Sequence, residues 1–239
     1  MADPKKVAII VTSHASMGDT GEKTGVWLEE FTTPYYHLRD AGLTVDVFSV
    51  AGGDIPIDPR SVEGDAQKEE SVARYLKDER LQTTVKTTPS VDQIDLDGYD
   101  AVFFPGGHGT MWDYPPNGAI AEVVSQGLDA GKIIATVCHG PACLVNAKTK
   151  AGAPVVKGRR VTGFSNSEEK AAGLTDVVPF LLETKLRELG AMYESVDDFQ
   201  PFAIRDGDLI TGQNPASAKK VADSLIEALT HSAKRREVA

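Results

Sequence analysis

The sequence predicts an α/β fold in which a mostly parallel sheet carries helices on both faces. Short apolar runs rich in β-branched residues alternate with longer amphipathic stretches, a rhythm typical of βαβ units. The first of these runs, KVAIIVT, is continuously apolar, as expected of a strand that is covered on both sides. With 239 residues, 41% of them hydrophobic, the chain is long enough to bury a sizeable core. We therefore expect a single α/β domain over residues 1–239.

The first fifty residues predict one strand–helix–strand unit. Residues 6–12 form the first strand, and a polar loop containing glycine follows over residues 13–24. The amphipathic stretch 25–41 predicts a helix that ends before Gly42, since glycine is the preferred residue just beyond a helix C-terminus. Residues 43–50 form the second strand.

Residues 51–90 differ in kind from the rest of the chain. They contain two glycines and two prolines before residue 60 and many charges throughout, and only residues 66–81 have a helical pattern. We interpret this segment as an excursion inserted between two strands of the sheet. An irregular segment of this length is either a surface loop or a lid or interface element, and the sequence favours neither.

The regular alternation returns after residue 98. The patterns predict strands at residues 99–104, 132–137 and 160–163, and helices at residues 118–130, from 138 onward, at 177–190 and at 216–232. Asp206-Gly207 between residues 202–205 and 208–211 predicts a β-hairpin, because this dipeptide favours a tight two-residue turn.

Charge and cysteine content limit the possible partners. The net charge of −10 argues against nucleic acid or an anionic membrane, both of which require a basic surface. No apolar run is long enough to cross a membrane, and the first residues lack a signal-peptide pattern. The two cysteines have neither CxxC nor zinc-site spacing, which favours a reducing, cytoplasmic location.

Cys138 is the candidate nucleophile. It lies where an apolar strand meets a predicted helix start, followed by Gly140 and Pro141, which suit a tight turn and a first helical turn. Such an elbow presents a nucleophile at the carboxyl edge of a parallel sheet, where ligands bind. A helix N-terminus would also lower the pKa of the thiol. Cys143 has only apolar neighbours, and we expect it to be part of the core.

His139 and an acid would complete a catalytic arrangement. Adjacent side chains at a turn are expected to point apart, so the position of His139 after Cys138 does not establish a hydrogen bond. The acid that orients His139 would be Glu168 or Glu169, which follow the strand-end sequence Thr162-Gly163-Phe164. Two consecutive glutamates are also common on solvated surfaces, so the residues alone leave this assignment open.

Glu30 is a second candidate acid. On the predicted helix it lies three residues from Trp27 and four from Pro34, and so borders the apolar face. An apolar setting raises the pKa of a carboxyl and lets it hold a proton near neutral pH. The alternative is a border residue of an ordinary amphipathic helix.

The glycine-rich loop Gly106-Gly107-His108-Gly109 follows a strand end beside the elbow. Small residues there allow backbone N–H groups to approach an oxyanion. The loop does not match the dinucleotide-binding pattern GxGxxG. Gly106 and His108 are candidate substrate contacts, although His108 could equally be a polar loop residue. The histidines have no metal-site spacing, and we predict no metal.

The chain resembles the ThiJ/PfpI superfamily, and in particular its branch of glutathione-independent glyoxalases (glyoxalase III) and heat-shock chaperones. The resemblance spans nearly the whole chain in order, and it rests on the agreement of several motifs rather than on any one of them. The motifs are Lys23-Thr24-Gly25 leading to Glu30, residues 55–61, residues 105–115, residues 135–142 around Cys138, residues 161–164 with Glu168-Glu169, and residues 209–217. A mild departure is Ser165-Asn166, where the family has Thr-Asp or similar.

The resemblance implies a flavodoxin-like fold and assigns roles to individual residues. Cys138 would be the nucleophile, Glu30 the acid that hydrogen-bonds it, and His139 with Glu169 the rest of the triad. The backbone N–H groups of Gly107 and His139 would form the oxyanion hole. Glu169 is preferred over Glu168 because it matches the family position.

The activity implied is conversion of methylglyoxal, a 2-oxoaldehyde, to lactate by a homodimer that needs no cofactor. The resemblance leaves two alternatives. One is a cysteine amidase or peptidase of the same superfamily, and the other is a holdase chaperone or redox-sensing stress protein.

Overall fold

The structure, a computed structural model, describes residues 4–237, with side chains described up to residue 230. At its centre is a six-stranded sheet with the strand order β2-β1-β3-β4-β8-β7. All neighbouring strands are parallel except β7 and β8, which pair antiparallel. The strands are β1 (Lys6–Val11), β2 (Thr44–Ser49), β3 (Ala101–Phe104), β4 (Ile133–Val137), β7 (Ala203–Asp206) and β8 (Leu209–Gly212). The mostly parallel sheet predicted from the apolar runs is confirmed.

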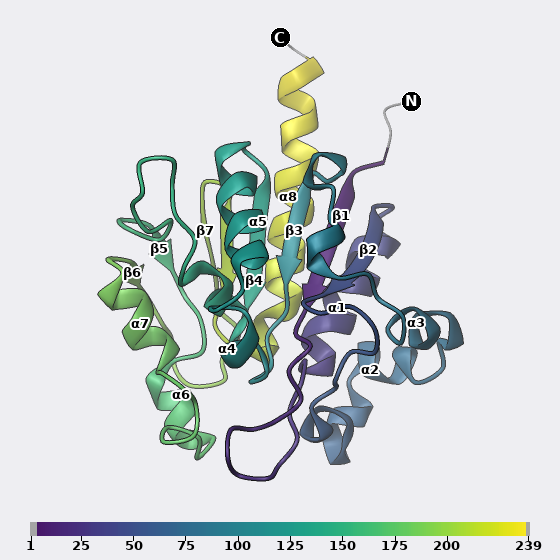
Figure 1. Ribbon diagram of the computed structural model, residues 1–239. Helices are drawn as coiled ribbons and strands as arrows, with labels where there is room; N and C mark the ends of the chain where they lie inside the picture. The colour runs from purple at the N-terminus through teal and green to yellow at the C-terminus, as the bar shows by residue number, and fades with distance from the viewer. Residues whose placement is uncertain (1–3, 238–239) are drawn as a thin grey trace.

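Helices cover both faces of this sheet. Helices α1 (Leu28–Asp40) and α8 (Ala218–Glu237) pack against each other on one face, and α8 contacts β4 and β8. Helices α4 (Thr110–Asp113) and α5 (Gly118–Asp129) lie on the other face, so that the sheet is sandwiched between α5 and α8 (Figure 1). Within residues 4–237, no helix combines the length and the apolar character needed to cross a membrane.

Several turns form for the reasons that the sequence indicates. Gly42 and Gly131, which follow α1 and α5, have φ values of 85° and 69°, a left-handed conformation that glycine adopts without strain. Gly207, with φ 61°, closes the β7–β8 hairpin. Because β1, β3 and β4 are parallel, their carboxyl ends lie at one edge of the sheet, where the candidate residues lie.

The region after β4 departs from the prediction. Cys138 is followed by a single 3₁₀ segment, Gly140–Leu144, rather than by an α-helix. Strand β5 (Arg160–Val161) does not join the main sheet but pairs with β6 (Met192–Tyr193) in a separate two-stranded sheet. The helix predicted at residues 177–190 is the shorter α7 (Leu182–Glu188).

Helix α6 (Asn166–Ala171) was not predicted. The sequence contains one signal for this helix, the capping box that Ser165 and Glu168 form at its start. The apolar pattern that follows is too short for a helix to be recognised from periodicity alone.

The excursion at residues 51–90 forms short helical pieces rather than one helix. They are the 3₁₀ segments Pro59–Val62 and Gly64–Lys68, and the helices α2 (Glu70–Tyr75) and α3 (Glu79–Thr84). Helix α2 packs against α1. The start of the excursion is tied to the loop before α1, since the N–H of Val26 donates to the Pro56 carbonyl and that of Asp58 to the Val26 carbonyl. These bonds bring residues 56–60 beside the site. Two further 3₁₀ turns, Val91–Gln93 and Leu96–Gly98, lead into β3.

Candidate active site

Cys138 lies on a strained turn at the end of β4. Its φ is 60°, a left-handed conformation that is uncommon for a residue other than glycine and is often found at functional sites. Two backbone bonds hold this turn: the N–H of Cys138 donates to the Gly212 carbonyl at 2.9 Å, and that of Phe164 donates to the Cys138 carbonyl at 2.8 Å. The elbow expected from the sequence is therefore present, with the Cys138 side chain facing the candidate site.

The predicted lowering of the Cys138 pKa is wrong. The five-residue 3₁₀ segment that follows is too short to supply the dipole of an α-helix. Burial and the neighbouring Glu30 carboxyl instead raise the pKa of the thiol well above its usual value. Formation of a thiolate therefore depends on where the proton goes among the adjacent side chains.

The His139 side chain turns back toward Cys138, contrary to the expectation that the two point apart. Its Nδ1 lies 3.3 Å from the Cys138 Sγ. Its Nε2 lies 2.7 Å from Oε2 of Glu169. The left-handed backbone of Cys138 is what allows two adjacent side chains to meet. Cys138, His139 and Glu169 thus form one hydrogen-bonded series inside the protein.

The two consecutive glutamates have different surroundings. Glu169 faces His139 and His108 at 2.7 and 2.9 Å, and these histidines lower its pKa well below the usual range, although burial alone would raise it. Glu168 points into a different network and accepts hydrogen bonds from the backbone N–H groups of Ser165 and Phe199 and from the side-chain amides of Gln213 and Asn214. Glu169 is therefore the acid in contact with His139.

Glu30 is completely buried on α1. Its Oε2 accepts a hydrogen bond from the N–H of Gly106 at 2.8 Å. Its Oε1 is buried without a well-formed hydrogen bond from any described residue, although the carboxyl is close enough to the Cys138 thiol for each to shift the other's pKa. Burial raises the pKa of Glu30 well above its usual value. Because two buried negative charges in contact are unfavourable, simultaneous ionisation of Glu30 and Cys138 is disfavoured.

The glycine loop comes very close to the site residues. A Cβ on Gly106 would lie 2.7 Å from the Glu30 carboxyl oxygen and from the N of His139. Gly107 has φ 99°, and a Cβ there would lie 2.2 Å from the Gly25 carbonyl. Only glycine fits at these two positions. The N–H of His139 interacts with the Cys138 thiol, so the oxyanion hole of Gly107 and His139 stays a prediction.

His108 has both ring nitrogens engaged by protein groups. Nε2 lies 2.9 Å from Oε1 of Glu169, and Nδ1 lies 3.3 Å from Nη2 of Arg60. A substrate would therefore meet the ring of His108 rather than a free nitrogen. The predicted substrate contacts of His108 and Gly106 stay predictions.

A cavity of about 190 Å³ lies over Cys138. It is smaller than the roughly 300–1,000 Å³ of sites for drug-sized ligands, and so suits a small molecule. Sequence reasoning missed much of its wall, because these side chains come from loops that are distant in sequence. The main lining residues are Trp27, Arg60, His108, Cys138, Phe164 and Phe199.

The residues around Glu169 also have the donor set of a metal site. The ligand atoms of His108, His139 and Glu169 all lie within 4.8 Å of one another. Two imidazoles and a carboxylate are a common set for zinc and other transition metals. In this structure the same atoms are hydrogen-bonded to one another. The absence of a metal therefore stays a prediction.

The fold and the site together define an α/β protein with a buried cysteine on a strained elbow, flanked by a histidine–glutamate pair and a second carboxyl. The chain matches the DJ-1/PfpI family over residues 23–228 and belongs to this family. It is 32% identical to the "Glutathione-independent glyoxalase HSP31" of Saccharomyces cerevisiae, over 95% of this chain and 98% of the relative.

Two solved structures show the same fold at full length. A Francisella tularensis structure titled "Rapid Encystment Protein 24 KDa" is 44% identical, covers 94% of this chain and 99% of its own, and superposes with a TM-score of 0.90. Glyoxalase III of Candida albicans is 29% identical, covers 94% of this chain and 97% of its own, and has a TM-score of 0.86. The family and the flavodoxin-like fold that the sequence motifs imply are confirmed.

Proposed function

We propose that this protein is a glutathione-independent glyoxalase that converts methylglyoxal and related 2-oxoaldehydes to 2-hydroxy acids. One observation carries the proposal: the Cys138 thiol lies between the Glu30 carboxyl and the His139 imidazole at the base of a small cavity. The names of the full-length relatives from S. cerevisiae and C. albicans support the substrate class.

In the first step the Cys138 sulfur adds to the aldehyde carbon C1 of methylglyoxal. The thiol proton passes to Glu30 or His139, both of which contact the sulfur. A C–S bond forms, and the aldehyde oxygen becomes the hydroxyl or alkoxide of a hemithioacetal. Backbone N–H groups of Gly107 and His139 are the candidates to stabilise the negative charge on this oxygen.

In the second step Glu30 or His139 removes the proton from C1, and a proton returns at C2 through an enediol. C1 is thereby oxidised to a thioester and C2 reduced to an alcohol, so no external oxidant or reductant is needed. Water then hydrolyses the thioester and releases lactate and the free thiol. The net reaction adds one water to methylglyoxal, and no cofactor takes part.

The proposal is tested by following lactate formation from methylglyoxal by purified protein without any added thiol. We expect stoichiometric lactate. Absence of lactate from a folded protein whose Cys138 is reduced would rule out the glyoxalase, and turnover of amide substrates by the same sample would favour a cysteine amidase.

Glu169 and Glu168 provide a matched pair of variants. We expect Glu169→Gln to lower kcat by about 10²–10³-fold, because His139 loses the charged partner that orients it, with a small effect on melting temperature. Glu168→Gln is expected to lower the melting temperature by several degrees, because four donors lose a carboxylate acceptor. Steady-state kinetics and thermal unfolding of both variants check this. The assignment fails if Glu168→Gln lowers kcat more than Glu169→Gln.

The chaperone alternative would need an exposed apolar patch. Among the described residues only Leu76, Met192, Val196 and Phe199 are large, hydrophobic and exposed. If Cys138→Ala loses lactate formation but still suppresses the aggregation of another protein, the chaperone role is separate from turnover. The homodimer and the cytoplasmic location stay predictions.

A further inference from the structure

Arg60 links the excursion at residues 51–90 to the candidate catalytic residues. It lines the cavity, and its Nη2 lies 3.3 Å from Nδ1 of His108. From His108 the contacts continue through Glu169 to His139 and from there to Cys138. Arg60 is the member of this series whose protonation is fixed, because a guanidinium stays charged in proteins and only donates hydrogen bonds.

The positions of the protons follow from Arg60 together with the Glu169 carboxylate, which only accepts hydrogen bonds. Since Arg60 donates, Nδ1 of His108 must accept, so a neutral His108 carries its proton on Nε2. That N–H then donates to Oε1 of Glu169 at 2.9 Å.

The same reasoning extends to the thiol. With Oε1 of Glu169 occupied by His108, Oε2 accepts from Nε2–H of His139 at 2.7 Å. A neutral His139 then has its unprotonated Nδ1 directed at the Cys138 sulfur, 3.3 Å away. This is the tautomer that is able to accept the thiol proton.

We propose that Arg60 is a positioning residue that requires an unprotonated Nδ1 on His108 and thereby keeps a divalent cation out of the His108–Glu169–His139 cluster. A metal bound at Nε2 of His108 would force the proton onto Nδ1, where it would oppose the N–H of Arg60. The guanidinium also adds a positive charge next to the cluster. Cation binding and the catalytic tautomer therefore exclude each other.

Arg60 is held rigidly enough for this role. Its Nε and Nη2 donate to the two carboxylate oxygens of Asp58 at 2.9 and 2.6 Å, a bidentate pair. Asp58 is itself fully buried and also accepts from the backbone N–H of Arg60 and from the Thr24 hydroxyl. The backbone bonds between Val26 and residues 56 and 58 anchor the same segment.

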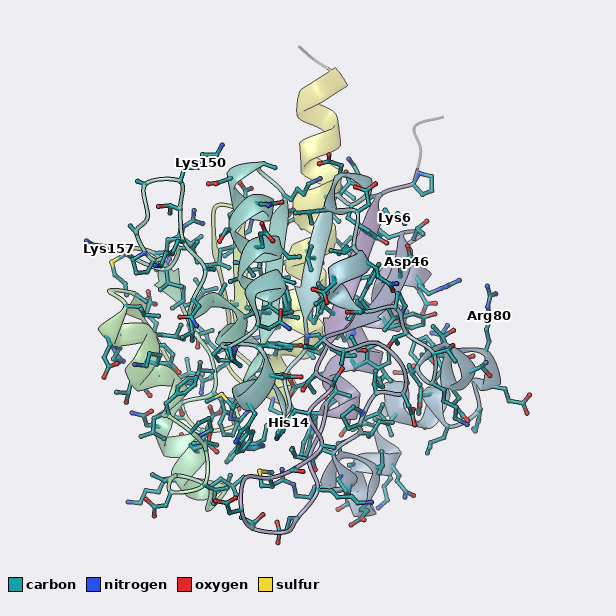
Figure 2. The ribbon with its side chains drawn as sticks, viewed as in Figure 1. Lys6, His14, Asp46, Arg80, Lys150 and Lys157 are labelled. Carbon is teal, nitrogen blue, oxygen red and sulfur yellow. The ribbon has the colours of Figure 1, made fainter. Side chains whose placement is uncertain are left out.

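The test uses the full chain labelled with ¹⁵N-histidine. Long-range ¹H–¹⁵N spectra report which ring nitrogen of each histidine carries a proton. In the wild type we expect the proton of His108 and that of His139 to lie on Nε2. Because the Glu169 carboxylate accepts from Nε2 of both histidines, we expect Arg60→Met to keep this tautomer until a cation is added and then to show His108 protonated on Nδ1. Arg80→Met is the matched control, because Arg80 lies on α3 and its side chain points into solvent at the edge of the molecule (Figure 2).

Zinc titration of the same samples tests the exclusion of a cation. We expect Zn²⁺ to perturb the His108 and His139 signals in Arg60→Met at concentrations about 10–100-fold lower than in the wild type or Arg80→Met, the range that outer partners of a metal site typically control. Equal affinity in the wild type and Arg60→Met would overturn the proposal, and so would a wild-type His108 protonated on Nδ1.

Arg60→Met leaves the buried Asp58 carboxylate without its cation and could unfold the protein. The double variant Asp58→Asn/Arg60→Met removes that charge, and the same spectral changes and zinc affinity are expected in it. The catalytic meaning of the tautomers rests on the proposed glyoxalase function. The spectra and the zinc titration need no turnover, so they succeed or fail independently of that function.

Discussion

Cys138→Ala is expected to abolish lactate formation from methylglyoxal, with a loss of kcat of about 10⁴-fold or more, as when the nucleophile of a covalent mechanism is removed. Without the sulfur no hemithioacetal forms on the protein, and His139 and Glu30 have no thiol with which to exchange a proton. Lactate measured over a long incubation checks this.

Cys143→Ala is the matched control for this variant. Cys143 is equally buried, but it is not among the residues that line the cavity. We expect it to retain nearly full activity. Substantial lactate from Cys138→Ala, with Cys143→Ala unchanged, would show that the sulfur is not the nucleophile.

Glu30→Gln is expected to lower kcat by about 10²–10⁴-fold, the range for loss of a general acid or base. Glutamine has nearly the same volume and keeps an oxygen that accepts from the N–H of Gly106, so the backbone there is retained. It is unable to take up or release a proton at Cys138. Glu29→Gln, one position earlier on the same helix, is the control and should leave kcat nearly unchanged.

The same substitution should stabilise the fold, and the gain should depend on pH. The folded-state pKa of Glu30 is raised by burial, so its contribution to stability is full below the unfolded pKa of about 4.3 and is lost as the pH rises toward the folded value. Glutamine carries no such charge. We therefore expect Glu30→Gln to raise the melting temperature more at pH 8 than at pH 5. A gain that is independent of pH would mean that folding does not raise the pKa of Glu30.

Local patterns were sufficient to predict two of the central residues. Cys138 could be recognised because a continuous apolar strand followed by Gly140 and Pro141 fixes a turn through short-range geometry alone. Glu30 could be recognised because helical periodicity places it beside Trp27 and Phe31, and the structure buries it completely.

Long-range contacts could not be derived in this way. Arg60 reaches the site only because backbone bonds tie an irregular excursion to the loop before α1. Irregular segments have no periodicity from which such a contact could be predicted. The choice between Glu168 and Glu169 depends on which way each side chain leaves a short helix, and the helix itself was not predicted. The helix predicted after Cys138 is only a 3₁₀ segment of five residues, because a few short-range signals do not determine the length of a helix.

The central claim is that 2-oxoaldehydes turn over as covalent adducts of Cys138. It is tested most directly by mixing the wild-type protein with methylglyoxal without added thiol, quenching the mixture at successive times, and locating the adduct by peptide mass spectrometry while lactate is measured in the same samples. The account predicts an adduct on the peptide containing Cys138 that forms before lactate appears and decays as lactate is released. Lactate that accumulates with no adduct on Cys138 at any time, or an adduct that never decays, would contradict it.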